Sequence, residues 1–302
     1  MTYAKVIVNP SAGGGKTAKV WPDVLAALRS SGLDFDYALT TARGQTTEIA
    51  RMAATQGYKL VVSVGGDGTA NEVANGLFQS GCLDKVALGI VATGTGCDYI
   101  RTIGTPPEYR EACQRLVSPK RLSVDLGIVE FVNGGKAMSR IFLNSAGAGL
   151  DAEITRATNK QLKFLSPRLS YLGGLLWALL SYRNRDIRLR IGDEIDERKI
   201  CMVLMSIGKF GGGGMLTAPD ADPGDGLFDV LIIGDVSKPD LLWALRRVYQ
   251  GTHLTHSKVM TKRAREVEIH PVQPIAVQAD GELLGEAPAK FKIMHGMLQV
   301  VV

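Results

Sequence analysis

Over residues 1–122, short apolar runs alternate with stretches in which apolar residues recur every three to four positions. The runs are rich in β-branched residues, which is typical of buried strands. They lie at 4–8, 35–39, 61–64 and 86–91. Between them, spacing such as that of Trp21, Leu25 and Leu28 predicts amphipathic helices. Strands that alternate with helices predict a doubly wound α/β domain, in which ligands bind at the carboxyl ends of the strands.

The pattern changes near Leu122, beyond which most apolar runs follow one another without intervening helices. These runs lie at 123–131, 138–144, 187–191, 200–207, 228–233, 267–270, 275–279 and 291–294. Many short strands separated by turn signals predict an antiparallel β-sandwich. Two helices are expected among them, one at 241–249 and one that begins at Ser166-Pro167, a favourable N-cap and first helical residue. We therefore predict an α/β domain at 1–122 and a β-sandwich domain at 123–302, and leave open whether the last strand returns to the first domain.

One predicted strand runs directly into a glycine turn and a helix, through Gly65-Gly66-Asp67-Gly68-Thr69. Glycines let the backbone approach an anion closely, and the first N–H groups of a helix have no partner within it. The combination predicts a phosphate-binding turn, although a tight turn with a solvated aspartate would have the same sequence pattern. Asp67 makes the prediction more specific, because a carboxylate among such amides repels phosphates unless a divalent cation lies between them. The spacing and the missing lysine exclude a P-loop.

Two further glycine-rich segments follow predicted strands, at 11–16 and at 92–99. The first ends in a cation, Lys16. A flexible surface loop would explain either segment alone. Because the carboxyl ends of parallel strands meet at one edge of a sheet, we expect both segments to lie near the Asp67 turn.

Composition excludes several classes of protein. A hydrophobic content of 45% and a charged content of 22% are those of an ordinary globular chain of 302 residues. The net charge of +5 suits an anionic membrane surface or a nucleotide, but no basic stripe interleaved with aromatic residues indicates nucleic-acid binding. The four cysteines form no metal-type or redox-type pair, which indicates a reducing compartment. With no signal peptide and no apolar run long enough for a membrane span, we expect a cytoplasmic protein.

The pentapeptide at Asp67 resembles the nucleotide signature of diacylglycerol-type lipid kinases, NAD kinases and phosphofructokinases. Four further segments match the first of these families in its own order along the chain. They are Asn9-Pro10-Ser11-Ala12-Gly13, Gly94-Thr95-Gly96-Cys97-Asp98, Asp225-Gly226-Leu227-Phe228-Asp229 and Asp280-Gly281-Glu282. The chain thus resembles the diacylglycerol-kinase-like lipid kinases over nearly its whole length. The resemblance implies a nucleotide-binding α/β domain, a β-sandwich domain and an active site in the cleft between them.

The resemblance also implies the ligands and the residues that bind them. The ATP-binding residues would be Asn9, Pro10, Ser11, Ala12, Gly13, Thr40 or Thr41, Gly66, Asp67, Gly68, Thr69, Ala70, Asn71, Glu72 and Thr95. Asp67 would hold the catalytic Mg²⁺ through water, with Asp98 and Asp125 supporting that network. For Asp125 the alternative is an ordinary turn residue at the end of a strand.

Two further sites follow from the same resemblance. Glu282 would be the general base that takes the proton of a lipid hydroxyl, although a two-residue hairpin turn explains Asp280-Gly281 without any chemistry. A structural Mg²⁺ would be bound by the side chain of Asp225, with Asp222 and Leu227 at the positions that supply backbone carbonyls. A turn rich in proline, glycine and aspartate also forms without a metal.

We predict an ATP-dependent lipid kinase that phosphorylates a hydroxyl of diacylglycerol or a related lipid. The alternatives are an NAD kinase-like enzyme and a nucleotide-binding regulator without catalysis. Cys97 departs from the family, which has asparagine at that position, and a thiol is a poor replacement for a carboxamide. The sequence does not name the lipid, and it leaves the oligomeric state open, a homodimer included.

The predicted enzyme works at a membrane surface without spanning it. The expectation rests on the segment 162–182, in which Leu169, Leu172, Leu176 and Leu179 form an apolar stripe. Leu175 and Trp177 lie off that stripe, so the helix is apolar over more of its circumference than core packing requires. The alternative is that the second domain covers this helix.

Overall fold

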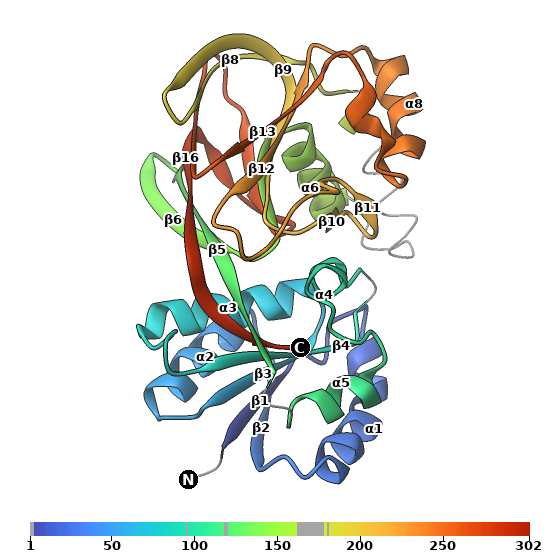
Figure 1. Cartoon of the computed structure of the whole chain (residues 1–302), viewed down its shortest axis with the longest axis vertical. Coiled ribbons are helices and arrows are strands. Elements are labelled where there is room, and N and C mark those ends of the chain that lie inside the picture. The colour runs from blue at the N-terminus through green and yellow to red at the C-terminus, as the bar shows by residue number, and fades with distance from the viewer. Residues whose placement is uncertain (1–2, 95, 118–119, 162–177, 180) are drawn as a thin grey trace. The chain divides into compact units, whose positions relative to one another are not determined.

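The computed structural model describes residues 3–94, 96–117, 120–161, 178–179 and 181–302 of the chain. The chain folds into two compact units (Figure 1). The α/β unit contains Met1–Leu126, Pro223–Gly226 and Met294–Val302, and the β-rich unit contains Gly127–Asp222 and Leu227–Ile293. The predicted helix from Ser166-Pro167 lies outside the described residues.

The α/β unit is built on a parallel sheet with the strand order β2-β1-β3-β4. Its elements are β1 (Ala4–Val8), α1 (Lys16–Ser30), β2 (Phe35–Leu39), α2 (Gln45–Thr55), β3 (Leu60–Gly65), α3 (Asp67–Ser80), β4 (Ala87–Ala92), α4 (Asp98–Ile103) and α5 (Tyr109–Arg115). The four strands predicted for this part of the chain are confirmed. The end of β16 (Glu282–Val301) adds a further parallel strand beside β4.

Helices cover both faces of this sheet, as a doubly wound fold requires (Figure 1). Trp21 and Leu28 of α1 pack with Val6 and Val62 on the face that α5 also covers. On the other face, α2 and α3 contact each other and the central strands. Gly76 permits the close approach of these two helices, because a Cβ there would lie 2.3 Å from the carbonyl oxygen of Thr47.

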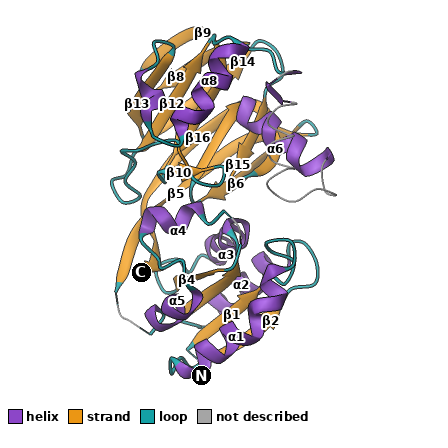
Figure 2. Ribbon diagram, turned by 90° about the vertical axis from the view of Figure 1, so that its right-hand side faces the viewer, coloured by secondary structure: helices purple, strands orange, loops and turns teal. Residues whose placement is uncertain are grey.

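Antiparallel strands dominate the β-rich unit (Figure 2). Its elements are β5 (Arg121–Asn133), β6 (Lys136–Phe142), β7 (Ser145–Gly149), α6 (Leu150–Gln161), β8 (Arg185–Ile191), β9 (Glu194–Ser206), β10 (Phe210–Gly211), β11 (Met215–Leu216), β12 (Phe228–Gly234), α8 (Lys238–Val248), a 3₁₀ helix (Thr252–Thr255), β13 (Val259–Ala264), β14 (Glu266–Pro271), β15 (Ala276–Ala279) and β16. Pairing runs from β9 through β7, β15, β16, β14 and β8 back to β9. The strands therefore enclose a common interior.

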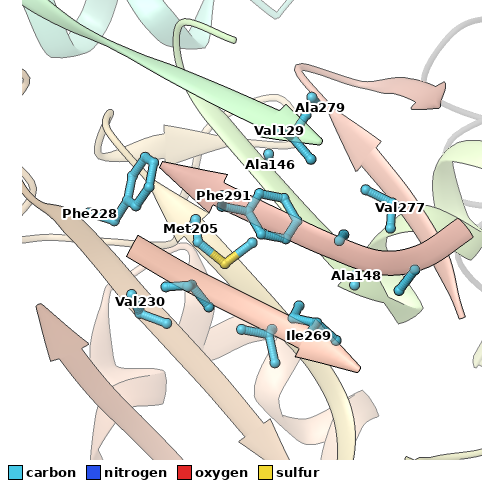
Figure 3. Packing of buried hydrophobic residues seen from close by; sticks show 14 of the residues in the cluster. Val129, Ala146, Ala148, Met205, Phe228, Val230, Ile269, Val277, Ala279 and Phe291 are labelled. Carbon is cyan, nitrogen blue, oxygen red and sulfur yellow. The ribbon is translucent and has the colours of Figure 1, made fainter. Parts of the chain in front are cut away.

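Apolar side chains from nearly every strand fill that interior. Phe291, Met205 and Val277 point into it from three different strands (Figure 3). The rings of Phe142 and Phe228 stack at 5.7 Å. Position 127 must be glycine, because a Cβ there would lie 2.1 Å from the Phe142 ring. The predicted fold class, an α/β domain followed by an antiparallel β domain, is confirmed.

Several elements differ from the sequence prediction. Helices α4, α5 and α6 and strands β7 and β13 were not predicted, and β16 is far longer than the expected 291–294. β7 has the sequence Ser-Ala-Gly-Ala-Gly, which lacks the residue types that favour strands. It is a strand because tertiary packing requires small residues there: a Cβ at Gly147 would lie 2.4 Å from the Asp151 carboxylate, and one at Gly149 2.5 Å from a carbonyl of β9.

Candidate functional site

Three glycine turns meet at the carboxyl ends of β1, β3 and β4. A Cβ on Gly94 would lie 2.8 Å from the Cα of Gly66. A Cβ on Gly13 would lie 3.5 Å from the Cα of Gly94. Backbone therefore faces backbone in this glycine cradle, which we define as Gly13, Gly66 and Gly94 with their turns. No other residue type at Gly94 leaves the turns this close.

Side-chain hydrogen bonds connect these turns to the neighbouring helices. The Asn9 side-chain amide donates to the hydroxyl of Thr69 at 3.3 Å, which connects the β1 turn to α3. The hydroxyls of Thr17 and Thr93 lie 2.6 Å apart and connect α1 to the β4 turn. The Asn9 carboxamide oxygen also accepts the amide of Ser11, which shapes the predicted loop from Asn9 to Gly13.

The predicted ATP-binding residues of α3 divide into two groups. Thr69, Ala70 and Asn71 are buried, so their side chains support the turn and offer almost no surface to a ligand. Gly68 is exposed, with no atom near the position of a Cβ. The amides of Thr69 and Ala70 donate to the Gly66 carbonyl at 2.9 and 3.2 Å, which leaves the earlier amides at the exposed start of the helix for a ligand. Phosphate oxygens would therefore meet backbone N–H groups here. Thr95 lies outside the described residues.

The two threonines after β2 form hydrogen bonds to the end of β1 and to the start of α2. The Thr40 hydroxyl donates to the Val8 carbonyl at 3.3 Å. The amide and hydroxyl of Thr41 both donate to the side-chain oxygen of Gln45, at 2.7 and 3.2 Å. These contacts fix the loop beside the β1 turn, and the role of either hydroxyl in ATP binding stays a prediction.

Asp67 is the first residue of α3, and its carboxylate reaches the start of α4. Oδ2 accepts the amide of Asp98 at 2.9 Å, and Oδ1 accepts the amide of Tyr99 at 3.3 Å. The side chain thus caps α4 and fastens the β3 turn to the β4 turn. No local pattern indicates this second role, since it joins residues more than thirty positions apart.

Cys97 lies between these carboxylates in a left-handed backbone conformation, with φ 53° and ψ 44°. Burial, followed by the negative charges of Asp67 and Asp98, raises the pKa of its thiol to about 11, while the charge of Lys16 opposes the shift. The thiol is therefore neutral. The ammonium of Lys16 is close enough to act on it, which makes Lys16 a candidate phosphate contact that was not among the predicted site residues.

The cradle fits the phosphates of a nucleotide by its chemistry. It offers backbone amides at glycines where a side chain would not fit, and a nearby lysine. The fit to Mg²⁺ is through Asp67. Both of its oxygens already accept one amide each, and a carboxylate oxygen has two acceptor positions. Carboxylate oxygens are the ligands that Mg²⁺ prefers, and Mg²⁺ usually keeps several of its waters, so a contact through water suits Asp67.

Asp125 is fully buried within β5, so the alternative of a turn residue at a strand end is wrong. Its carboxylate accepts the amides of Gly226 and Gly296, each at 2.7 Å, and lies 2.8 Å from Nδ1 of His295. Its own amide donates to the carbonyl of Pro223. One carboxylate therefore fastens three segments of the α/β unit. Its support of a metal network stays a prediction.

The contacts of Asp125 reach only part of the loop that was predicted to bind a structural metal ion. Asp222 is exposed, and Asp225 and Leu227 are half-buried. Burial, and after it the charges of Asp220 and Asp222, raises the pKa of Asp229 to about 6. Within the described ranges, no three His, Cys, Asp or Glu side chains group so as to hold a metal ion. A cation at this loop would need backbone carbonyls, which were predicted to come from Asp222 and Leu227.

Glu282 follows the two-residue hairpin turn that was predicted between β15 and β16. Asp280 and Gly281 both have positive φ, 46° and 76°, which is the type I′ conformation. The Asp280 carboxylate accepts the amides of Leu143, Asn144 and Ser145 at 2.7 to 3.0 Å. The turn is thereby fixed against the loop between β6 and β7.

Three side chains that the sequence did not single out surround this turn. Arg140 of β6 pairs with Oε2 of Glu282 at 2.7 Å. Gln278 accepts the amide of Gly281 at 3.0 Å and donates to Oδ2 of Asp151 at 2.8 Å. A partly buried chain of hydrogen bonds thus runs from α6 to the turn. No local signal predicts the contacts of Arg140 with Glu282 and of Gln278 with Asp151, because these partners are more than 120 positions apart.

Comparison with known proteins gives matches over nearly the whole chain. Residues 3–129 match the family described as "Diacylglycerol kinase catalytic domain", and residues 144–302 match "YegS C-terminal NAD kinase beta sandwich-like domain". The chain is 28% identical over 298 residues to a diacylglycerol kinase of Staphylococcus carnosus, covering 98% of this chain and 94% of the relative. It is also 28% identical over 304 residues to a diacylglycerol kinase of Bacillus subtilis, covering 100% and 97%.

Solved structures share the fold. One described as a diacylglycerol kinase from Bacillus anthracis superposes with a TM-score of 0.73 at 19% identity, covering 99% of this chain and 96% of the other. In the described part of the chain, no helix has the length and apolar character needed to cross a bilayer.

Proposed function

The chain belongs to the diacylglycerol-kinase-like family of lipid kinases, and on that premise we propose that it transfers the γ-phosphoryl group of ATP to a hydroxyl of diacylglycerol or a related lipid. A kinase of this family uses a nucleotide as phosphoryl donor. The proposal also includes ATP as that nucleotide, Mg²⁺ as the cation bound with it, and Glu282 as the general base.

The observation that carries the proposal is the glycine cradle. Phosphoryl transfer needs little covalent chemistry from the protein and depends on positioning and charge neutralisation. Gly13, Gly66 and Gly94 present backbone at close range, Lys16 adds a positive charge, and Gly68 leaves the start of α3 open. This is the arrangement that phosphate oxygens require.

Bound Mg²⁺ would supply positive charge to the transferring phosphoryl group. Asp67 would hold it through water, with Asp98 beside it. The predicted structural Mg²⁺ at Asp222, Asp225 and Leu227 is kept as part of the proposal. It is separate from catalysis, and would add stability to the loop that Asp125 already fastens.

Glu282 would take the proton of the lipid hydroxyl. Its side chain is 55% exposed, so a substrate can reach it, and the hairpin and the Asp280 contacts hold its backbone in place. Arg140 pairs with Oε2, and Oε1 would accept the proton. Arg140 is thereby a positioning residue for the base.

The test is a transfer assay with labelled ATP and Mg²⁺, in which diacylglycerol, phosphatidylglycerol, a sphingoid base and NAD are offered separately. Labelled lipid with at least one lipid acceptor is expected. Transfer to NAD alone would show the NAD kinase-like alternative instead, and binding of ATP with no transfer to any acceptor would show a regulator.

A glycine substitution tests the cradle itself. Gly94→Ala would place a Cβ 2.8 Å from the Cα of Gly66, so the turns must separate and ATP should bind at least tenfold more weakly. Gly211→Ala is the matched control, because a Cβ there makes only ordinary contacts at 3.7 Å and beyond. Equal ATP affinity in the two variants would refute the role of the cradle.

A further inference from the structure

A cavity of about 550 Å³ lies in the β-rich unit, away from the Glu282 turn in sequence and in its lining residues. Its apolar side is formed by Leu150 and Leu179, both buried, and by Leu241 of α8. These leucines belong to a small apolar cluster of their own, distinct from the main core of the unit. The catalytic proposal assigns nothing to this cavity.

Positive charge lines the rest of the cavity. Arg183, Arg185, Lys199 and Lys238 contribute to its wall. Among the described residues, no carboxylate pairs with Arg183, Arg185 or Lys199. We call Arg183, Arg185, Lys199 and Lys238 the cationic rim.

Two carboxylates also line the cavity, and they do not cancel the rim. The carboxylate of Asp235 accepts a hydrogen bond from the side-chain amide of Asn184 at 2.6 Å, so one of its oxygens is engaged by a neighbouring residue. Asp186 stands opposite Lys199 across the β8–β9 pair, without forming an ion pair with it. Four cations against two carboxylates leave an excess of two positive charges around an apolar floor.

Helix α8 forms one wall of the cavity and carries a second apolar face. Lys238, Leu241 and Leu245 recur at helical spacing, and the two leucines pack on the small cluster. Beyond this stripe the helix is uncovered: Leu242 is 51% and Trp243 57% exposed, and the helix has no buried residue.

The exposed face of α8 combines apolar and basic groups. The guanidinium of Arg247 lies 3.9 Å above the ring of Trp243. Arg246 is exposed beside it, and Tyr249 follows the helix with 53% exposure. Tryptophan, tyrosine and arginine are the residue types that settle at the boundary between lipid headgroups and acyl chains. A face meant for water would not present two large apolar side chains together.

We propose that the cavity and the exposed face of α8 form a docking site for anionic phospholipid at a membrane surface. The phosphate of one headgroup binds the cationic rim, and its glycerol and first methylene groups lie on the leucine floor. Leu242 and Trp243 enter the interfacial layer beside it. Charge complementarity selects an anionic lipid, and the apolar floor selects a lipid over a free anion.

The site goes beyond the phosphoryl-transfer proposal, because none of its residues takes part in that reaction. It relies on the family only for the expectation that a lipid kinase meets its substrate in a bilayer. Docking would hold the enzyme at the surface while substrate exchanges. The sequence predicted membrane contact from the segment 162–182, of which 162–177 and 180 lie outside the described residues. Leu179, a member of the predicted apolar stripe, is buried and forms part of the cavity floor.

The experiment measures vesicle co-sedimentation of the full chain without nucleotide and without diacylglycerol. Vesicles contain phosphatidylcholine alone or phosphatidylcholine with phosphatidylglycerol. Wild type should sediment with the anionic vesicles only. Arg183→Gln/Lys199→Gln tests the rim and Leu242→Ser/Trp243→Ser tests the face, and each should weaken binding at least tenfold. The matched controls, Arg29→Gln/Lys85→Gln and Met138→Ser/Ile195→Ser, remove the same charge or exposed apolar groups elsewhere and should bind like wild type.

Several results would overturn the proposal. The first is wild-type binding that does not depend on anionic lipid. The second is rim and face variants that bind like wild type. The third is release of wild type by inorganic phosphate but not by chloride at equal ionic strength. Folding is checked by transfer to a short-chain, water-soluble diacylglycerol, which the variants should phosphorylate as wild type does. Rim-dependent binding without transfer to any lipid would sustain this site and refute the proposed function. Transfer without rim-dependent binding would do the reverse.

Discussion

Asp151→Asn should stabilise the protein at neutral pH, and the gain should disappear in acid. Asp151 is the second residue of α6, and its oxygen Oδ1 is buried without a hydrogen-bond partner. Burial raises the pKa of this carboxyl from 3.8 to about 6, against the opposing effect of the hydrogen bond from Gln278. At neutral pH the folded protein therefore carries a buried charge that asparagine would remove.

The magnitude follows from the shift. A difference of about two pKa units corresponds to about 3 kcal/mol at 1.36 kcal/mol per unit. Because the residue keeps some surface, we expect about 1–3 kcal/mol. The pKa is higher in the folded state, so the folded protein binds the proton more tightly, and wild-type stability falls as pH rises from about 4 to about 6. The advantage of Asp151→Asn should grow across this window and be constant above it.

Urea unfolding of both proteins at pH values from 4 to 8 measures this difference. The asparagine oxygen still accepts the Gln278 amide, so the chain of hydrogen bonds to Gly281 is kept. Asp193→Asn is the matched control, since Asp193 is exposed in the turn between β8 and β9 and should leave stability unchanged at every pH. Our reasoning about burial is wrong if Asp151→Asn is no more stable than wild type at pH 8, or if its advantage does not depend on pH.

Three further substitutions test other contacts. Cys97→Asn should raise the melting temperature by about 2–4 °C, because asparagine tolerates the left-handed conformation better, and a lower melting temperature would contradict this. Asp125→Ala should cost about 3 kcal/mol or more in urea unfolding, since the amides of Gly226 and Gly296 lose their acceptor, and a cost below about 1 kcal/mol would show that water replaces it. Glu282→Gln should lower turnover by about 10²–10⁴-fold at unchanged ATP affinity, while a collapse of ATP binding would make the hairpin purely structural.

The elements that could be predicted are those whose pattern is local. The buried strands of the α/β unit are continuous apolar runs, and β3 with its glycine turn was recognisable because strand, turn and helix follow one another directly. The hairpin at Asp280-Gly281 was also recognisable, since the two residues by themselves favour the type I′ turn.

The elements that could not be predicted depend on distant parts of the chain. β7 consists of small residues and forms because Gly147 and Gly149 fit between β9 and the start of α6. The pair Arg140–Glu282 likewise joins segments with no common pattern. Cys97 shows a middle case: its departure from the family was visible in the sequence, but the left-handed backbone that explains an asparagine there was not.

Asp67 shows that a residue predicted from the sequence to act in catalysis can also have a structural role. From the sequence, a carboxylate among phosphate-binding amides implied a cation. In the structure the same carboxylate also caps α4, and its removal would leave the amides of Asp98 and Tyr99 without their acceptor, at about 1–3 kcal/mol each. Loss of turnover in Asp67→Ala would therefore not by itself establish a metal contact, because displacement of the β4 turn would have the same effect.

The two roles separate when stability and Mg²⁺ dependence are measured together. Asn at position 67 keeps one acceptor oxygen, so Asp67→Asn should retain part of the cap and lose less stability than Asp67→Ala. If the cap alone matters, turnover should follow stability across the two variants at an unchanged Mg²⁺ requirement. If Asp67 also holds the cation through water, Asp67→Asn should need far more Mg²⁺ than its small loss of stability explains. A Mg²⁺ requirement equal to that of wild type in both variants would leave Asp67 as a structural cap only.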